Sequence, residues 1–113
     1  MKNIIGISLL FVASTFASSA YATKVLQRTI EQVNVADDDA GNPQLIIKIN
    51  GGLQSSSCTD KTAFIRPLND EIGKQLMAVS LTAISTGALV DIVGIGNCGS
   101  WDVETFKEIR LYK

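Results

Sequence analysis

The sequence predicts a mostly β fold with one helix, in the α+β class. Short segments rich in β-branched residues recur between clusters of Gly, Pro, Asn and Asp, which is typical of strands joined by turns. One segment, residues 72–83, repeats its apolar residues at the helical period instead. The chain has 113 residues, so one small domain is the expected organisation.

Residues 1–22 have the features of a secretory signal peptide. Lys2 gives a basic start, residues 4–13 are apolar, and the segment ends in Ala-Tyr-Ala at 20–22, where small residues suit signal peptidase. We expect cleavage after Ala22, with cleavage after Ala20 as the alternative. The apolar run is shorter than the roughly 20 residues that span a bilayer.

The expected domain is therefore residues 23–113, exported to the periplasm or the extracellular space. Removing 22 of the 113 residues leaves 91, of which 9 are basic and 11 acidic, for a net charge of −2. This near-neutral balance gives no electrostatic reason to expect nucleic acid or an anionic membrane as a partner.

The sequence of the first half of the domain predicts three strands. Residues 24–35 are rich in β-branched residues, although Leu26, Ile30 and Val33 would also line one face of a helix. Residues 37–43 form a turn by composition, and residues 44–50 alternate as a second strand of a hairpin. A flexible loop, residues 51–58, and a third strand, residues 62–66, follow.

The second half predicts a helix and two strands. Asn69 or Asp70 offers an N-cap, and Gly87 is the expected left-handed C-cap. The apolar stripe of this helix is predicted at Ile72, Leu76, Val79 and Ala83. Residues 88–95 indicate a buried strand, residues 96–102 a loop, and residues 103–112 a last strand, with a helix as the alternative. Residues 75–90 carry no charge but are too short for a membrane span.

The resulting order, β-β-β-α-β-β, matches an OB-fold-like five-stranded barrel with its helix between strands three and four. A plain sandwich of one sheet and one helix fits the same order less specifically. The two cysteines, Cys58 and Cys98, predict a disulfide in an exported protein. The alternatives are two buried free thiols or an intermolecular pair.

Composition argues against an enzyme. The chain contains no histidine, so it predicts no Ser-His-Asp or Cys-His catalysis and no His-based zinc site. We therefore expect no catalytic residues, no metal and no cofactor. The aspartates 37–39 could still form an acid–base pair, but their place in a turn favours a solvated loop, and they lack the spacing of a calcium loop. Residues 94–99 match G-x-G-x-x-G, but the helix and acidic residue that dinucleotide binding requires do not follow.

The element order and the segment 85–93 (Ser-Thr-Gly-Ala-Leu-Val-Asp-Ile-Val) resemble the B subunits of AB5 toxins, particularly the subtilase-cytotoxin and pertussis-like group. The segment is also similar to that of many short secreted bacterial proteins of unknown function. The toxin resemblance implies an OB-fold, ring-shaped homopentamers and binding of host-cell glycans. It supplies no matching sugar-contacting residue.

The candidate ligand site is the loop that holds Trp101. OB-folds commonly bind ligands with the loops after strands one and four, here residues 37–43 and 96–102. The indole of Trp101 could stack on a sugar, while Ser100 and Asp102 could bond its hydroxyl groups. The alternative is that Trp101 packs over the barrel end or the disulfide.

Two functions compete. The first is a non-catalytic binding module for a glycan or a surface protein; the second is a periplasmic structural or inhibitor-like protein without a small ligand. An exposed loop aromatic favours the first, and an exposed apolar sheet edge without one favours the second.

Overall fold

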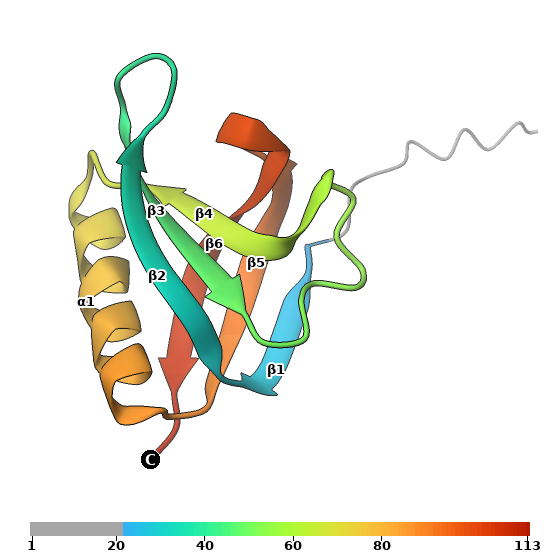
Figure 1. Ribbon diagram of the computed structural model, residues 1–113, viewed down its shortest axis with the longest axis vertical. Coiled ribbons are helices and arrows are strands. Elements are labelled where there is room, and N and C mark those ends of the chain that lie inside the picture. The colour runs from blue at the N-terminus through green and yellow to red at the C-terminus, as the bar shows by residue number, and fades with distance from the viewer. Residues whose placement is uncertain (1–21) are drawn as a thin grey trace, which may run out of the picture.

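The computed structural model describes residues 22–113, which form one six-stranded sheet and one long helix (Figure 1). The signal-peptide prediction therefore falls almost wholly outside the described residues. The strands are β1 (Lys24–Arg28), β2 (Ile30–Asp37), β3 (Pro43–Ile49), β4 (Asp60–Pro67), β5 (Val90–Cys98) and β6 (Val103–Leu111). The helix α1 spans Glu71–Thr86, and a short 3₁₀ turn, η1, spans Ser100–Asp102. The mostly β, α+β prediction is confirmed.

The strands lie in the order β1-β5-β6-β4-β3-β2. All neighbouring pairs are antiparallel except β4 and β6, which are parallel. The predicted hairpin is confirmed as β2 and β3, which pair from Ile30–Ile49 to Asp37–Pro43. The last segment is a strand, as predicted, because β6 completes its backbone hydrogen bonds between β5 and β4.

The strand count and the position of the helix differ from the prediction. Six strands are present, the sheet is unclosed, and α1 lies between β4 and β5. The cause is a break in the segment 24–35, which was expected to be one strand. Gln27 lies in a bulge of β1 with a positive φ of 55°, and its N–H bonds to the side chain of Asp91 on β5 at 2.8 Å instead of to a backbone carbonyl group. The chain then turns through Thr29 from one edge of the sheet to the other.

Both predicted caps of α1 are present. Asp70 accepts a hydrogen bond from the N–H of Gly73 at 2.7 Å, and Gly87 adopts the left-handed conformation at φ 69°. The predicted apolar stripe is confirmed at Leu76 and Ala83, and Val79 is partly buried, but the prediction is wrong at Ile72. Ile72 is 50% exposed, whereas Gly73, Leu76, Ser80 and Ala83 are buried.

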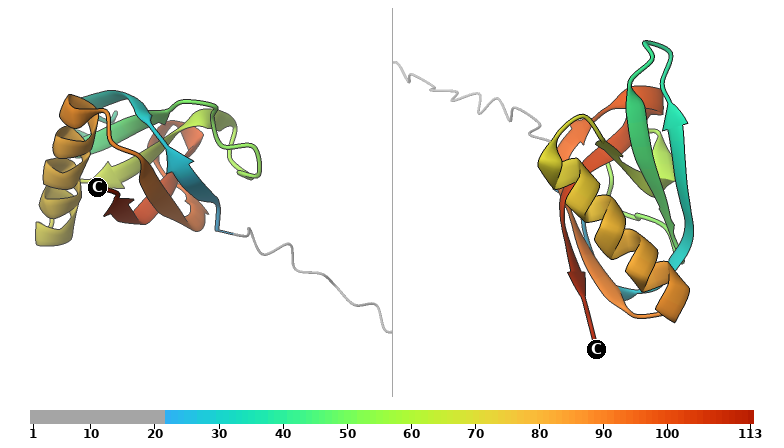
Figure 2. Two further views of the ribbon diagram at one scale, coloured as in Figure 1. Left: turned by 90° about the horizontal axis from the view of Figure 1, so that it is seen from below. Right: turned by 90° about the vertical axis from the view of Figure 1, so that its left-hand side faces the viewer.

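The close approach of the helix explains this register. A Cβ on Gly73 would lie 2.2 Å from the carbonyl oxygen of Pro67, so only glycine fits there. The helix contacts β2, β3 and β6 through small residues and Leu76 and lies along one side of the sheet (Figures 1 and 2). None of the helices within residues 22–113 is long and apolar enough to cross a membrane.

The main core lies between α1 and the sheet. Phe64 and Phe106 form its centre, with ring centroids 5.9 Å apart and both rings fully buried. The remaining buried members are mainly branched aliphatics from β1, β2, β3 and β5 and from the loop after β3 (Val25, Ile30, Leu45, Ile47, Ile49, Leu53, Val90 and Ile92). A smaller cluster of Ala63, Ile65 and Val103 packs on the other side, with Ile46.

Candidate functional site

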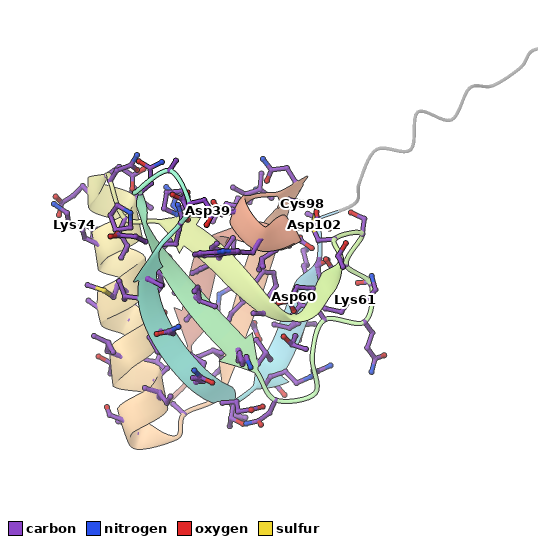
Figure 3. All side chains as sticks on the ribbon, turned by 45° about the horizontal axis from the view of Figure 1, so that its top comes forward. Asp39, Asp60, Lys61, Lys74, Cys98 and Asp102 are labelled. Carbon is purple, nitrogen blue, oxygen red and sulfur yellow. A yellow bond between two sulfur atoms is a disulfide. The ribbon has the colours of Figure 1, made fainter. Side chains whose placement is uncertain are left out.

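The predicted disulfide between Cys58 and Cys98 is present. It joins the loop before β4 to the end of β5, with the two Cα atoms 5.7 Å apart. Asp102 lies beside it, and the two sulfurs and this carboxylate fall within 4.8 Å of one another (Figure 3). Because both sulfurs are bonded to each other, they offer no thiolate to a metal ion.

The loop 38–42 and the turn η1 meet at one end of the sheet. The link between them is a hydrogen bond of 2.8 Å from the Ser100 hydroxyl to Asp38 Oδ2. A shallow hollow of about 220 Å³ lies at this junction, lined by Asp38, Asp39, Ala40, Ser100 and Trp101. The two loops that the sequence analysis selected therefore share one concave surface.

Trp101 is half-exposed over this hollow, with 44% of its surface accessible. Its backbone is left-handed, at φ 57° and ψ 19°, and Asp102 also has a positive φ of 56°. Such conformations cost about 1–3 kcal/mol for residues other than glycine and gather at functional sites. More than half of the residue is covered, so the ligand contact and the packing of Trp101 over the barrel end or the disulfide both stay predictions.

Asp38 builds the first loop and is not a free ligand group. Its Oδ1 accepts hydrogen bonds from the N–H groups of Ala40 and Asn42, at 3.0 and 2.9 Å. The bond from Asn42 is the main cause that lowers the pKa of Asp38, and the bond from Ser100 adds to it. Asp38 thus stays ionised and holds both loops together. The sequence signal was present, since Asp commonly caps its own turn in this way.

Asp102 does not belong to the hollow. Its Oδ2 accepts a hydrogen bond from the N–H of Thr59 at 2.8 Å, next to the disulfide. Thr59 lowers the pKa of Asp102 through this contact, and the charge of Lys61 contributes less. Figure 3 shows Asp102 beside Cys98 and Asp39 on the other loop. Of the three predicted ligand residues, Trp101 and Ser100 line the hollow, and Asp39, which was read as a loop aspartate, lines it as well.

A second, larger hollow of about 530 Å³ lies at the C-terminal end of α1. It is lined mainly by Leu89, Leu111 and Tyr112, with Thr82 and Thr86 of α1. Leu89 and Leu111 are 43% and 39% exposed. Few charged groups reach this surface, so it has the chemistry of a protein contact more than that of a polar-ligand site.

These features define a small disulfide-bonded α+β domain with a polar, aromatic hollow between two loops. In comparisons with known proteins, no family model, no curated protein and no solved structure matches the chain. The resemblance to toxin B subunits therefore rests on the segment 85–93 and on a predicted order of elements that differs from the observed one.

Proposed function

We propose that this protein is an exported, non-catalytic binding module that takes a glycan at the hollow beneath Trp101. The observation that carries the proposal is the half-exposed indole, which a left-handed backbone holds over a hollow lined by carboxylates. An exposed tryptophan is costly to leave in water, and a large rigid aromatic is the usual anchor of a binding surface.

The chemistry of the hollow suits a sugar. The indole offers a flat apolar face for the C–H face of a pyranose ring, and the Asp39 carboxylate can accept bonds from its hydroxyl groups. The Ser100 hydroxyl donates a hydrogen bond to Asp38, which leaves the Ser100 oxygen free to accept one from the sugar. At about 220 Å³ the hollow is smaller than the roughly 300–1,000 Å³ of enclosed ligand pockets. It therefore fits one terminal sugar at the surface of a longer glycan.

We also propose that the sheet is an OB-like barrel, which would account for the position of this hollow. The two edge strands, β1 and β2, are consecutive and have only Thr29 between them. Counted as the two halves of one bent strand, they give five strands with the helix between the third and the fourth. The hollow then lies between the loops after strands one and four, where OB-folds commonly bind ligands.

The second candidate function is a structural or inhibitor-like role at a sheet edge. Leu26 on β1 is 61% exposed and Val35 on β2 is 49% exposed, and edge strands offer unpaired backbone groups to a partner. Such an edge does not need an exposed tryptophan in a strained turn. For this reason the glycan-binding role is preferred.

The test is a glycan array probed with the wild type, Trp101→Ala and Trp101→Phe. We expect the wild type to bind a subset of glycans, the alanine variant to lose about tenfold or more in affinity, and the phenylalanine variant to keep part of it. Leu26→Ala is the matched control, because it removes an exposed apolar side chain from the edge strand β1. Circular dichroism checks that every variant folds.

Two outcomes would contradict the proposal. If the wild type binds no glycan, the hollow is not a sugar site. If Trp101→Ala binds as well as the wild type, the indole has only a packing role. Binding that is lost with Leu26→Ala and kept with Trp101→Ala would favour the sheet-edge function.

A further inference from the structure

The side chain of Glu104, in β6, is buried at one end of the domain. Only 1% of the residue is exposed, and its carboxyl group accepts two hydrogen bonds from Thr23. The backbone nitrogen of Thr23 lies 2.9 Å from Oε2, and the Thr23 hydroxyl lies 2.6 Å from Oε1. Thr23 is itself only 2% exposed, while Ala22, which precedes it, is exposed. A residue at the start of the domain thus reaches the interior.

Gly94 of β5 makes the room for this contact. A Cβ at Gly94 would lie 2.0 Å from Glu104 Oε2, so any other residue would displace the carboxyl group. The N–H of Gly94 also donates to the carbonyl oxygen of Thr23 at 2.8 Å. Gly94 therefore both fixes Thr23 in place and clears the space in which its nitrogen meets Glu104.

The charge at this position needs a partner. Burying a carboxylate is costly unless a cation and hydrogen bonds compensate it. No salt bridge formed within residues 22–113 involves Glu104. While Thr23 is joined to Ala22, its nitrogen is a neutral amide. If the chain begins at Thr23, the same nitrogen is an ammonium group, 2.9 Å from the carboxylate.

We propose that the leader is cut between Ala22 and Thr23 and that the new N-terminal ammonium group forms a buried ion pair with Glu104. In this step a signal peptidase hydrolyses the peptide bond with one water molecule. The carboxylate of Ala22 leaves with the leader, and the freed nitrogen of Thr23 is protonated. Cleavage after Ala20 would leave the nitrogen of Thr23 a neutral amide.

Processing and folding are coupled as a consequence. An uncut chain must bury Glu104 without a cation, so its folding is less favourable than that of the cut chain. This difference suits export, because the chain is exported unfolded. The domain reaches its full stability only after the leader has been removed. The inference rests on the contact between Thr23 and Glu104 and does not depend on glycan binding.

The first experiment is the intact mass of the exported protein together with the reactivity of its N-terminal amine. We expect a chain that begins at Thr23, whose amine reacts with an acylating reagent at least about tenfold more slowly than an exposed amine does, because the residue is buried. A chain that begins at Tyr21, or an amine as reactive as the exposed lysines, would overturn the proposal.

The second experiment is a double-mutant cycle on the exported protein. One alanine is inserted between Ala22 and Thr23, which moves the ammonium group one residue away, and Glu104→Gln is made with and without this insertion. We expect the insertion to lower the folded-to-unfolded ratio at least about tenfold in wild type and to have little further effect in Glu104→Gln.

Glu108→Gln is the matched control, because Glu108 lies on the same strand with 46% of its side chain exposed. The insertion should cost as much in Glu108→Gln as in wild type. An equal effect of the insertion in all three backgrounds would overturn the ion pair. If Glu104→Gln does not fold, the amine reactivity and the mass still decide the question.

Discussion

Asp91 joins three segments of the chain through one buried carboxylate. It accepts hydrogen bonds from the Tyr112 hydroxyl at 2.6 Å and from the N–H of Gln27 at 2.8 Å. The guanidinium group of Arg110 lies 3.7 Å away. The bond from Tyr112 is the largest cause that lowers the pKa of Asp91, and the same bond raises the pKa of Tyr112. The bulge in β1 and the residue that follows β6 are thus both bound to one carboxylate.

These shifts predict how stability changes in acid. The pKa of Asp91 is lower in the folded state than the roughly 3.9 of an unfolded aspartate. Its stabilising contribution is therefore complete above about pH 4 and is lost as the pH falls through the lower folded pKa. Tyr112→Phe removes the main cause of the shift, so we expect its acid-side loss of stability to be shallower than that of wild type. Urea unfolding from pH 6 to pH 2 measures the difference.

Arg110→Gln is the control for this prediction, because the charge of Arg110 contributes least to the shift. It should change the pH profile less than Tyr112→Phe does. If Tyr112→Phe and the wild type lose stability in parallel, the hydrogen bond to Asp91 does not control the pKa.

Among the elements, α1 departs most clearly from its sequence pattern. Ile72 and Leu76 belong to the same predicted apolar stripe, but Ile72 is 50% exposed and Leu76 is 7% exposed. The stripe is broad enough to allow more than one rotation of the helix. The contact of Gly73 with the carbonyl of Pro67 selects the rotation that is observed.

The pair of residues gives a direct test of this register. We expect Leu76→Ala to reduce the free energy of unfolding by about 2–4 kcal/mol, because it opens a cavity beneath the helix. Ile72→Ala should change it by less than about 0.5 kcal/mol, since an exposed helical site loses little packing and alanine is a good helix former. Equal losses for the two variants would mean that Ile72 faces the core, as the sequence predicts, and not the solvent.

At the scale of the whole molecule, the disulfide fixes the end of the sheet at which the candidate site lies. Cys98 ends β5, and Trp101 follows three residues later in the chain. Thr59, next to Cys58, donates to Asp102 in the same turn. Removing the covalent link would therefore loosen η1 as well as the loop before β4.

We expect the double variant Cys58→Ser, Cys98→Ser to lose about 4 kcal/mol of unfolding free energy, because the bridge closes a loop with a sequence separation of 40. Urea unfolding of the oxidised protein and the variant measures this loss. Intact mass should place the oxidised protein about 2 Da below its reduced form, the mass of two hydrogens. Free thiols under native conditions would contradict the bridge.

The resemblance to toxin B subunits predicts a homopentamer. The exposed Leu89 and Leu111, around the hollow of about 530 Å³, offer an apolar surface that contact between copies would bury. Gel filtration with light scattering should then give about five times the mass of the mature chain. A monomer would remove the toxin-like version of the proposal and leave the Trp101 site to the glycan array.

The sequence by itself determined the features that depend on local chemistry. The caps at Asp70 and Gly87 follow from side-chain hydrogen bonding and from the freedom of glycine at positive φ. The hairpin of β2 and β3 follows from alternation around a turn rich in Asx residues, and the bridge from an even count of cysteines.

Only the tertiary structure decided which groups face one another across the fold. Asp102 turns to Thr59 and away from the hollow, β1 bulges where the N–H of Gln27 reaches Asp91, and Thr23 meets Glu104 across 81 residues of sequence. Periodicity identifies which residues are apolar, but it contains no information on long-range partners. Those contacts are set by packing, where a single missing Cβ at Gly73 or Gly94 determines how closely two elements approach.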